Sequence, residues 1–212
     1  MSAAVPDLPT RRELLATGAG GLAATGATAA AGLLATGTAA AATTTASEPP
    51  VSETDRIQRL IRLELLLLYC YRYVLGSSIL EPRTRRTLAP FPGHEEAHIA
   101  ALAARLKARG ASMPAGPGSV AEANHDLAHR KIGGRLGQLK GGPDALRMLL
   151  TLEQVTIGAY FVSLTKLQDA QLIRLVCEIM GNEAQHDAMI TLSMPKARPG
   201  DAVPYGLVQG LQ

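Results

Sequence analysis

Two stretches of this chain place a single glutamate in the middle of an otherwise apolar helical stripe. In residues 54–80 the stripe of Ile, Leu and Tyr is interrupted at Glu64, and in residues 144–166 a similar stripe is interrupted at Glu153. A helix buries such a stripe against its neighbours. A lone buried carboxylate costs several kcal/mol unless its charge is compensated. Both segments are therefore predicted to be core helices that carry part of a polar site.

Two further segments carry a glutamate and a histidine three residues apart. Glu95 and His98 belong to a predicted helix that ends near Gly110, and Glu183 and His186 belong to another over about residues 170–193. A spacing of three places both side chains on the same face of a helix. Each segment thus presents a Glu–X–X–His pair to one neighbour.

The four motifs repeat at a nearly constant offset. The two stripe glutamates are 89 residues apart and the two Glu–X–X–His motifs are 88 apart, while Tyr71 and Tyr160, each seven residues after a stripe glutamate, are again 89 apart. This regularity predicts a duplicated pair of helices. Six side chains are then expected to converge on one buried cluster able to hold two metal ions: Glu64, Glu95, His98, Glu153, Glu183 and His186.

Other motifs and the composition narrow the alternatives. A third Glu–X–X–His, Glu122 with His125, has no partner glutamate at the matching offset, so it is predicted to be exposed. The net charge is only +3 with scattered Lys and Arg, which argues against nucleic acid as a partner. Cys70 and Cys177 form no CxxC pair and are predicted to remain unpaired. The alternative to a metal site is a bundle with partly exposed polar positions.

The two ends of the chain differ from its middle. Arg11, Arg12 and Glu13 are followed by about thirty uncharged residues, mostly Ala, Gly, Thr and Leu, the layout of a twin-arginine export signal. We expect export by the twin-arginine machinery to the periplasm, cell wall or exterior, or a membrane anchor if the signal is not cleaved. The predicted order is signal peptide, linker, helical bundle and irregular tail: residues 1–42, 43–53, 54–194 and 195–212.

These residues resemble the ferritin-like di-iron carboxylate family, which includes bacterioferritins and rubrerythrins. In that family one Glu from each of two helices and a Glu–X–X–His from each of the other two bind the metals. The resemblance implies an all-α four-helix bundle of two antiparallel pairs joined by a long crossover, with two iron ions, or manganese, as cofactors. It implies three ligand pairs: Glu64 with His98 at one ion, Glu153 with His186 at the other, and Glu95 with Glu183 bridging both.

The resemblance also concerns groups around the ligands. It implies that Tyr71 and Tyr160 hydrogen-bond to ligands. Many relatives have an Asp just before the Glu of each Glu–X–X–His, which orients the opposite histidine, whereas this chain has His94 and Asn182 there. Both are predicted to lie beside the ligands, and the histidines are expected to need another orienting partner.

The connections carry two further expectations. Pro90 and Pro92 lie where relatives have continuous helix, so a bend that opens the site to solvent is expected. The link over residues 110–141 is expected to be the long crossover, helical over about residues 119–139.

The resemblance implies an exported oxidoreductase that acts on O2, peroxide or Fe(II). The alternative is a non-catalytic, metal-binding or stress-protective envelope protein. Iron storage would need a hollow shell that nothing in the sequence encodes. Pairing of two bundles into a homodimer is left open.

Overall fold

The computed structural model describes residues 51–202, and over this range the chain is all-α, as predicted. Four long helices form a bundle: α2 (Glu53–Gly76), α4 (Phe91–Ala108), α6 (Gly142–Leu164) and α7 (Ala170–Leu192). Three shorter elements complete it: α3 (Pro82–Leu88), α5 (Val120–His129) and the 3-10 turn η1 (Pro199–Ala202). The predicted signal peptide lies outside the described residues, and of the predicted irregular tail only residues 195–202 lie within them.

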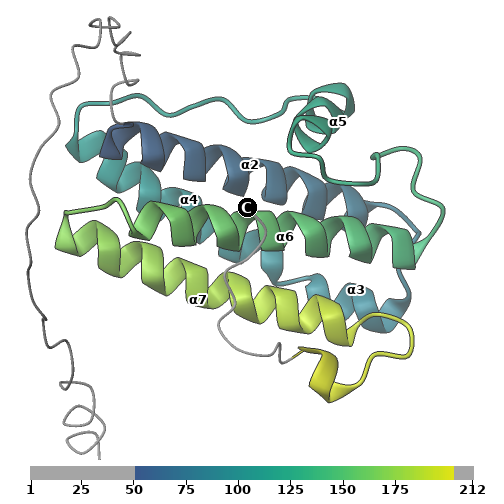
Figure 1. Cartoon of the computed structure of the whole chain (residues 1–212). Helices are drawn as coiled ribbons and strands as arrows, with labels where there is room; N and C mark the ends of the chain where they lie inside the picture. Colours follow the sequence, from purple (N-terminus) through teal and green to yellow (C-terminus); the bar gives the residue numbers. More distant parts are fainter. Residues whose placement is uncertain (1–50, 203–212) are drawn as a thin grey trace, which may run out of the picture. The chain divides into compact units, whose positions relative to one another are not determined.

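The four long helices form two antiparallel pairs, α2 with α4 and α6 with α7 (Figure 1). Arg109, just after α4, pairs with Glu53 at the start of α2 and with Asp169 at the cap of α7, so α4 ends where both of these helices begin. Helices α4 and α6 consequently run in the same direction. The link over residues 110–141 passes along the bundle from one end to the other, which confirms the predicted crossover.

The crossover is less helical than expected. Its helix is α5 alone, which Ser119 caps by accepting a hydrogen bond from the backbone N–H of Glu122. After α5 the backbone turns through positive φ at Lys131 (58°) and Gly134 (99°), which ends the helix. The later part is instead held by Asn124, whose side chain hydrogen-bonds both to the N–H of Leu136 (2.8 Å) and to its C=O (3.1 Å).

The first bundle helix is shifted relative to the prediction. It begins at Glu53, within the expected linker, because Ser52 and Asp55 form a capping box. It ends at Gly76 rather than at residue 80. There the guanidinium of Arg85 in α3 donates hydrogen bonds to the carbonyls of Leu75 and Ser77, which satisfies acceptors that a helix end leaves free.

The two prolines do not bend a helix, contrary to expectation. The chain forms the separate helix α3 first, and α4 then begins at Phe91 with Pro90 as its N-cap and Pro92 in its first turn. The first four N–H groups of a helix have no intrahelical acceptor, so proline costs nothing there. Helix α4 is therefore regular through Glu95 and His98.

The apolar core consists of two clusters, and the buried glutamates and histidines lie between them. One cluster includes Leu67, Leu149 and Ile190, and the other includes Ile61 and Val176. Helix α6 is long and apolar enough to cross a membrane by composition alone, but 56% of its most apolar window is buried in the bundle. Its apolar character is thus that of a core helix.

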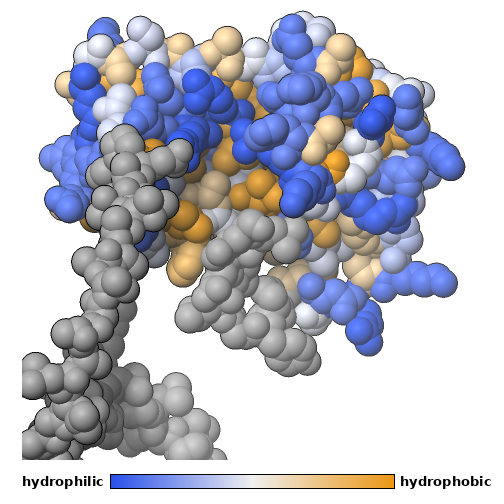
Figure 2. All heavy atoms as spheres, turned by 45° about the horizontal axis from the view of Figure 1, so that its top comes forward, coloured by the Kyte–Doolittle hydropathy of each residue, from blue (hydrophilic) through white to orange (hydrophobic). Residues whose placement is uncertain are grey.

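Hydrophilic residues cover most of the face drawn in Figure 2, with hydrophobic residues exposed between them. Among the described residues the exposed large apolar side chains are few: Met113, Val162, Met189 and Leu192. Both cysteines are free as predicted; Cys70 is buried and Cys177 is exposed. A candidate functional site is therefore sought among the buried polar side chains inside the bundle.

Candidate metal centre

Six titratable side chains from the four long helices meet between the two apolar clusters. Helices α2 and α6 each contribute one glutamate, whereas α4 and α7 each contribute a glutamate and a histidine. All six are buried, and the most exposed, His98, retains only 8% of its surface. The structure thus brings together every residue that the sequence proposes as a ligand: Glu64, Glu95, His98, Glu153, Glu183 and His186.

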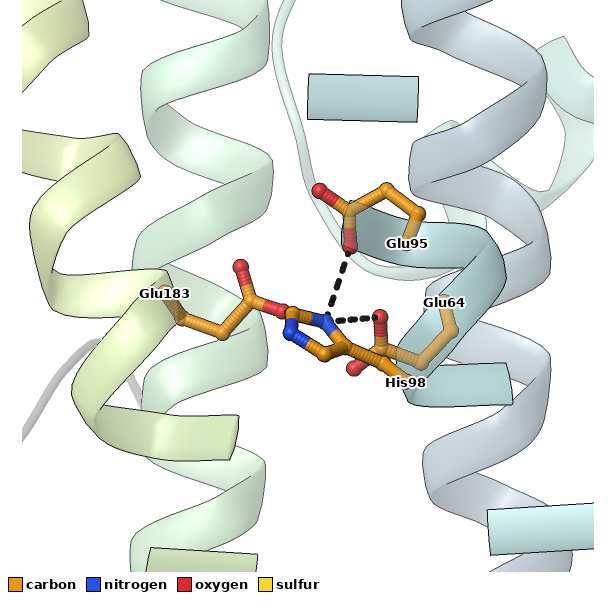
Figure 3. Close-up of side chains that lie close together, drawn as sticks. All are labelled: Glu64, Glu95, His98 and Glu183. Atoms are coloured by element: carbon orange, nitrogen blue, oxygen red, sulfur yellow. Dashed lines mark hydrogen bonds and ion pairs between the residues drawn. The ribbon is translucent and has the colours of Figure 1, made fainter. Parts of the chain in front are cut away.

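One half of the cluster surrounds His98. Its Nδ1 lies 2.9 Å from Oε1 of Glu183, 3.3 Å from Oε2 of Glu64 and 3.3 Å from Oε2 of Glu95. Figure 3 shows these four side chains converging from α2, α4 and α7. Each offers one ligand atom, and these atoms all lie within 4.8 Å of one another. The group is compact enough to surround a single ion.

The other half surrounds His186 in the same way. Its Nδ1 lies 3.1 Å from Oε2 of Glu183, 3.2 Å from Oε1 of Glu95 and 3.5 Å from Oε1 of Glu153. These four residues also place one ligand atom each within 4.8 Å of the others. The cluster therefore offers a second group of one imidazole and three carboxylates.

Glu95 and Glu183 belong to both halves, and each uses a different oxygen for each half. Glu95 directs Oε2 to His98 and Oε1 to His186. Glu183 directs Oε1 to His98 and Oε2 to His186. A carboxylate whose two oxygens face two neighbouring sites has the geometry of a bridging ligand.

The cluster leaves acceptor atoms unsatisfied. Both carboxylate oxygens of Glu95, Oε2 of Glu153 and Oε1 of Glu183 are buried without a hydrogen-bond partner among the described residues. A buried polar atom without a partner costs about 1–3 kcal/mol, and more if it is charged. Divalent cations would satisfy these oxygens, and four carboxylates would neutralise the charge of two such ions. The donor set therefore fits a pair of metal ions.

The carboxylate pKa values are perturbed in opposite directions. Burial, and then the nearby charge of Glu183, raises the pKa of Glu64 and of Glu153 well above 4.5. Burial acts in the same direction on Glu183, but the neighbouring imidazoles of His186 and His98 outweigh it and lower the pKa of that carboxylate. The cluster thus favours the charged form of Glu183.

Both imidazoles bind protons strongly in this environment. Burial alone would lower their pKa values, but the carboxylates of Glu183, Glu64 and Glu95 beside its Nδ1 raise the pKa of His98 to about 12. The carboxylates of Glu153, Glu183 and Glu95 likewise raise the pKa of His186 to about 11. Because metal ligation needs a deprotonated nitrogen, protons and divalent ions would compete for the same atoms.

Two tyrosines reach the stripe glutamates from the opposite helix. Tyr71 of α2 donates a hydrogen bond to Oε1 of Glu153 in α6, and Tyr160 of α6 donates one to Oε1 of Glu64 in α2. Both phenols are fully buried. Burial and the neighbouring carboxylates raise their pKa values, so the hydroxyls remain donors. Tyr71 and Tyr160 thus hydrogen-bond to glutamates of the cluster, as the sequence predicts.

The residues that precede Glu95 and Glu183 differ in their placement. Nδ1 of His94 lies 2.9 Å from Nε2 of His186, so His94 contacts the opposite histidine. Asn182 is only partly buried, and its side chain makes no hydrogen bond to the six ligands in residues 51–202. We expected both residues to lie beside the cluster, and a contact is present for His94 but not for Asn182.

Phe91 is a site residue that the motif spacing does not single out. Its ring stacks on His186 with the centroids 4.1 Å apart and the planes at 19°. The available signal was its position three residues before His94 and four before Glu95, which places all three on one helix face. Because Pro90 and Pro92 flank it, the sequence alone did not place Phe91 in the same helix as Glu95.

The third Glu–X–X–His motif has a local role. Glu122 and His125 are exposed on α5, and Oε2 of Glu122 accepts a hydrogen bond from the backbone N–H of Gly118 (2.7 Å). Neither belongs to a group of potential metal ligands among the described residues. The two buried Glu–X–X–His motifs are therefore distinguished from the exposed one by their spacing of 88 residues, not by the motif itself.

An all-α bundle with two buried carboxylate–histidine groups defines a class of helical proteins with a potential two-metal site. A family model for the ferritin-like domain matches residues 52–195, and the chain belongs to that family. The comparisons with curated proteins and with solved structures find no match.

Proposed function

We propose that the cluster binds two divalent ions, iron or manganese, and that the chain is an oxidoreductase acting on a small oxidant or on Fe(II). The observation that carries this proposal is the double use of Glu95 and Glu183, each of which presents one oxygen to each half of the cluster. Carboxylate and imidazole ligands suit Fe(II) and Mn(II). Glu64 with His98, and Glu153 with His186, would complete the two sites.

A bound pair of such ions would supply two-electron chemistry with O2 or peroxide. The protein's own contribution is burial and orientation. None of the six residues is more than 8% exposed, which limits access to small molecules and keeps bulk water away from the ligands. Tyr71 and Tyr160 hold the two stripe glutamates by hydrogen bonds and would fix the orientation of these carboxylates for metal binding.

A non-catalytic, metal-binding or stress-protective role is the second candidate. The same burial favours it, because a closed site can retain ions without turning anything over. The open cavity of about 740 Å3 beside Gly134 and Arg147 does not reach the cluster, so it provides no substrate channel. Oxidation of added Fe(II) separates the two roles: a catalyst consumes O2 or peroxide repeatedly, whereas a binding protein stops after its sites are filled.

We further propose that the protein is exported by the twin-arginine route. Arg11 and Arg12 and the long uncharged segment after them support this. The route carries folded proteins, which suits a chain loaded with metal before export. Replacing both arginines with lysine should keep the chain in the cytoplasm, and cell fractionation would show it; unchanged export would reject the route.

Metal content tests the function. The full chain, purified from its native host without chelators, should contain two Fe or Mn ions per chain by elemental analysis. The double variant Glu122→Ala and His125→Ala is the matched control, because it removes an exposed Glu–X–X–His and should leave the metal content unchanged. A wild-type chain that takes up no iron or manganese, either in the cell or on reconstitution, would reject the proposal.

A further inference from the structure

His94 precedes the ligand Glu95 in α4 and is only partly buried. Its ring is nearly coplanar with that of His186, with the planes at 9° and the centroids 5.2 Å apart. The atoms that join the rings are Nδ1 of His94 and Nε2 of His186, 2.9 Å apart. Coplanar rings with nitrogens at this distance form an edge-to-edge hydrogen bond.

The direction of this hydrogen bond follows from the other side of His186. Its Nδ1 is the nitrogen that faces Glu95, Glu153 and Glu183. An imidazole that binds a metal through Nδ1 carries its proton on Nε2, and the partner of that N–H sets the tautomer and the ring orientation. With a metal ion on Nδ1, Nε2 of His186 would donate to His94, and the unprotonated Nδ1 of His94 would accept.

The opposite half of the cluster has no such arrangement. Asn182 lies 88 residues after His94 but makes no hydrogen bond to His98, and no acceptor is bound to Nε2 of His98 in the part of the chain that the structure describes. Ile179 lies 88 residues after Phe91, so His98 also lacks the aromatic ring that stacks on His186. The two halves of the duplicated site thus hold their histidines differently.

We propose that His94 is a positioning residue for the metal ligand His186, acting by accepting the hydrogen bond from Nε2–H. The inference rests on the proposed metal site and deepens it, because it makes the two ion positions unequal. The His186 position has a ring held by His94 and Phe91, whereas the ring of His98 is held by carboxylates alone. Loss of His94 should therefore weaken the binding of one ion of the pair.

The test is titration of the full, metal-free chain with Co(II), followed by its optical absorption. The variant His94→Ala should lower the affinity for one of the two cobalt ions by about 10–100-fold, the usual effect of losing an orienting partner. His94→Asn should restore it, because Oδ1 of Asn occupies nearly the position of Nδ1 of His and is also an acceptor. Asn182→Ala, the matched control at the repeated position, should bind both ions as the wild type does.

The outcomes separate the inference from the proposed function. A wild-type chain that binds no cobalt rejects both. Two ions bound by wild type with unchanged affinities in His94→Ala, or an Asn variant as weak as the Ala variant, reject only the role of His94. Circular dichroism of the metal-free variants identifies any that fail to fold.

A second measurement does not depend on any variant folding. In zinc-loaded wild-type protein with 15N-labelled histidine, nuclear magnetic resonance should show one scalar coupling between two imidazole nitrogens across a hydrogen bond, with the proton on Nε2 of His186. A proton on Nδ1 of His186, or no coupling between two histidine rings, would overturn the inference.

Discussion

The phenol of Tyr71 in α2 hydrogen-bonds to the carboxylate of Glu153 in α6. The equivalent tyrosine of the second half, Tyr160 in α6, hydrogen-bonds to Glu64 in α2. Because α2 and α6 are antiparallel, a tyrosine seven residues after each glutamate reaches the glutamate of the other helix. The two contacts connect the two halves of the bundle beside the carboxylate–histidine cluster.

We predict that Tyr71→Phe and Tyr160→Phe destabilise the metal-free chain by similar amounts. Each substitution removes the donor to a fully buried carboxyl group, and such a loss costs about 1–3 kcal/mol. Denaturant unfolding in the presence of a chelator measures the difference. Tyr69→Phe is the control, since Tyr69 is a partly buried tyrosine of α2 outside the cluster; a Tyr71 variant no less stable than this control would contradict the prediction.

Replacement of the shared glutamates should affect metal content more than replacement of the stripe glutamates. Glu95 and Glu183 face both halves of the cluster, so Glu95→Ala or Glu183→Ala should remove both ions. Glu64→Ala or Glu153→Ala should leave about one ion per chain. Elemental analysis of each purified variant provides the measurement.

All four glutamates are fully buried, so the four variants are matched for cavity formation. Equal metal losses in all of them would contradict the bridging assignment.

The sequence was sufficient to predict the bundle and the meeting of its polar residues. An acidic residue inside an apolar stripe forces a buried site, and the offsets of 88 and 89 residues place the second half of that site opposite the first. These signals depend on periodicity within single helices. They hold because burial, rather than local propensity, determines which face of each helix is inside.

Features that depend on contacts distant along the chain could not be predicted. The end of α2 at Gly76 depends on Arg85 of another helix. Pro92 does not disrupt α4 because α3 ends at Leu88 and places Pro92 in the first turn of the next helix. His94 stands where many relatives have Asp, and its contact with His186 is visible only once α4 and α7 pack together.

Arg85 should contribute more to stability than the arginine beside it. Its guanidinium donates to the carbonyls of Leu75 and Ser77, and hydrogen bonds that involve a charged group are worth about 1.5–3 kcal/mol. We expect Arg85→Ala to lower the free energy of unfolding by about that amount. Arg86→Ala, at an exposed position in the same helix, should change it by less than about 0.5 kcal/mol. Equal effects of the two substitutions would show that Arg85 does not hold the end of α2.

The metal-free chain should lose stability as the pH rises. Folding raises the pKa of Glu64 and Glu153 above 4.5, and raises that of His98 and His186 from 6.5 to about 12 and about 11. A raised pKa contributes stability that is complete below the unfolded value and is lost as the pH rises through the folded value. Glu183 acts in the opposite sense, because its lowered pKa contributes stability that is lost only as the pH falls below 4.5.

Between about pH 5 and pH 9 the four raised groups therefore decide the sign, and the free energy of unfolding should decrease steadily with pH. Urea unfolding in the presence of a chelator at several pH values measures the slope. The double variant Glu64→Gln and Glu153→Gln carries neutral groups that resemble protonated carboxyls, so its slope should be smaller than that of the wild type. Bound divalent ions should also reduce the slope, because they replace the protons that the cluster otherwise needs. A metal-free chain whose stability rises over this range would mean that the buried carboxylates are charged in the folded protein and that another group compensates them.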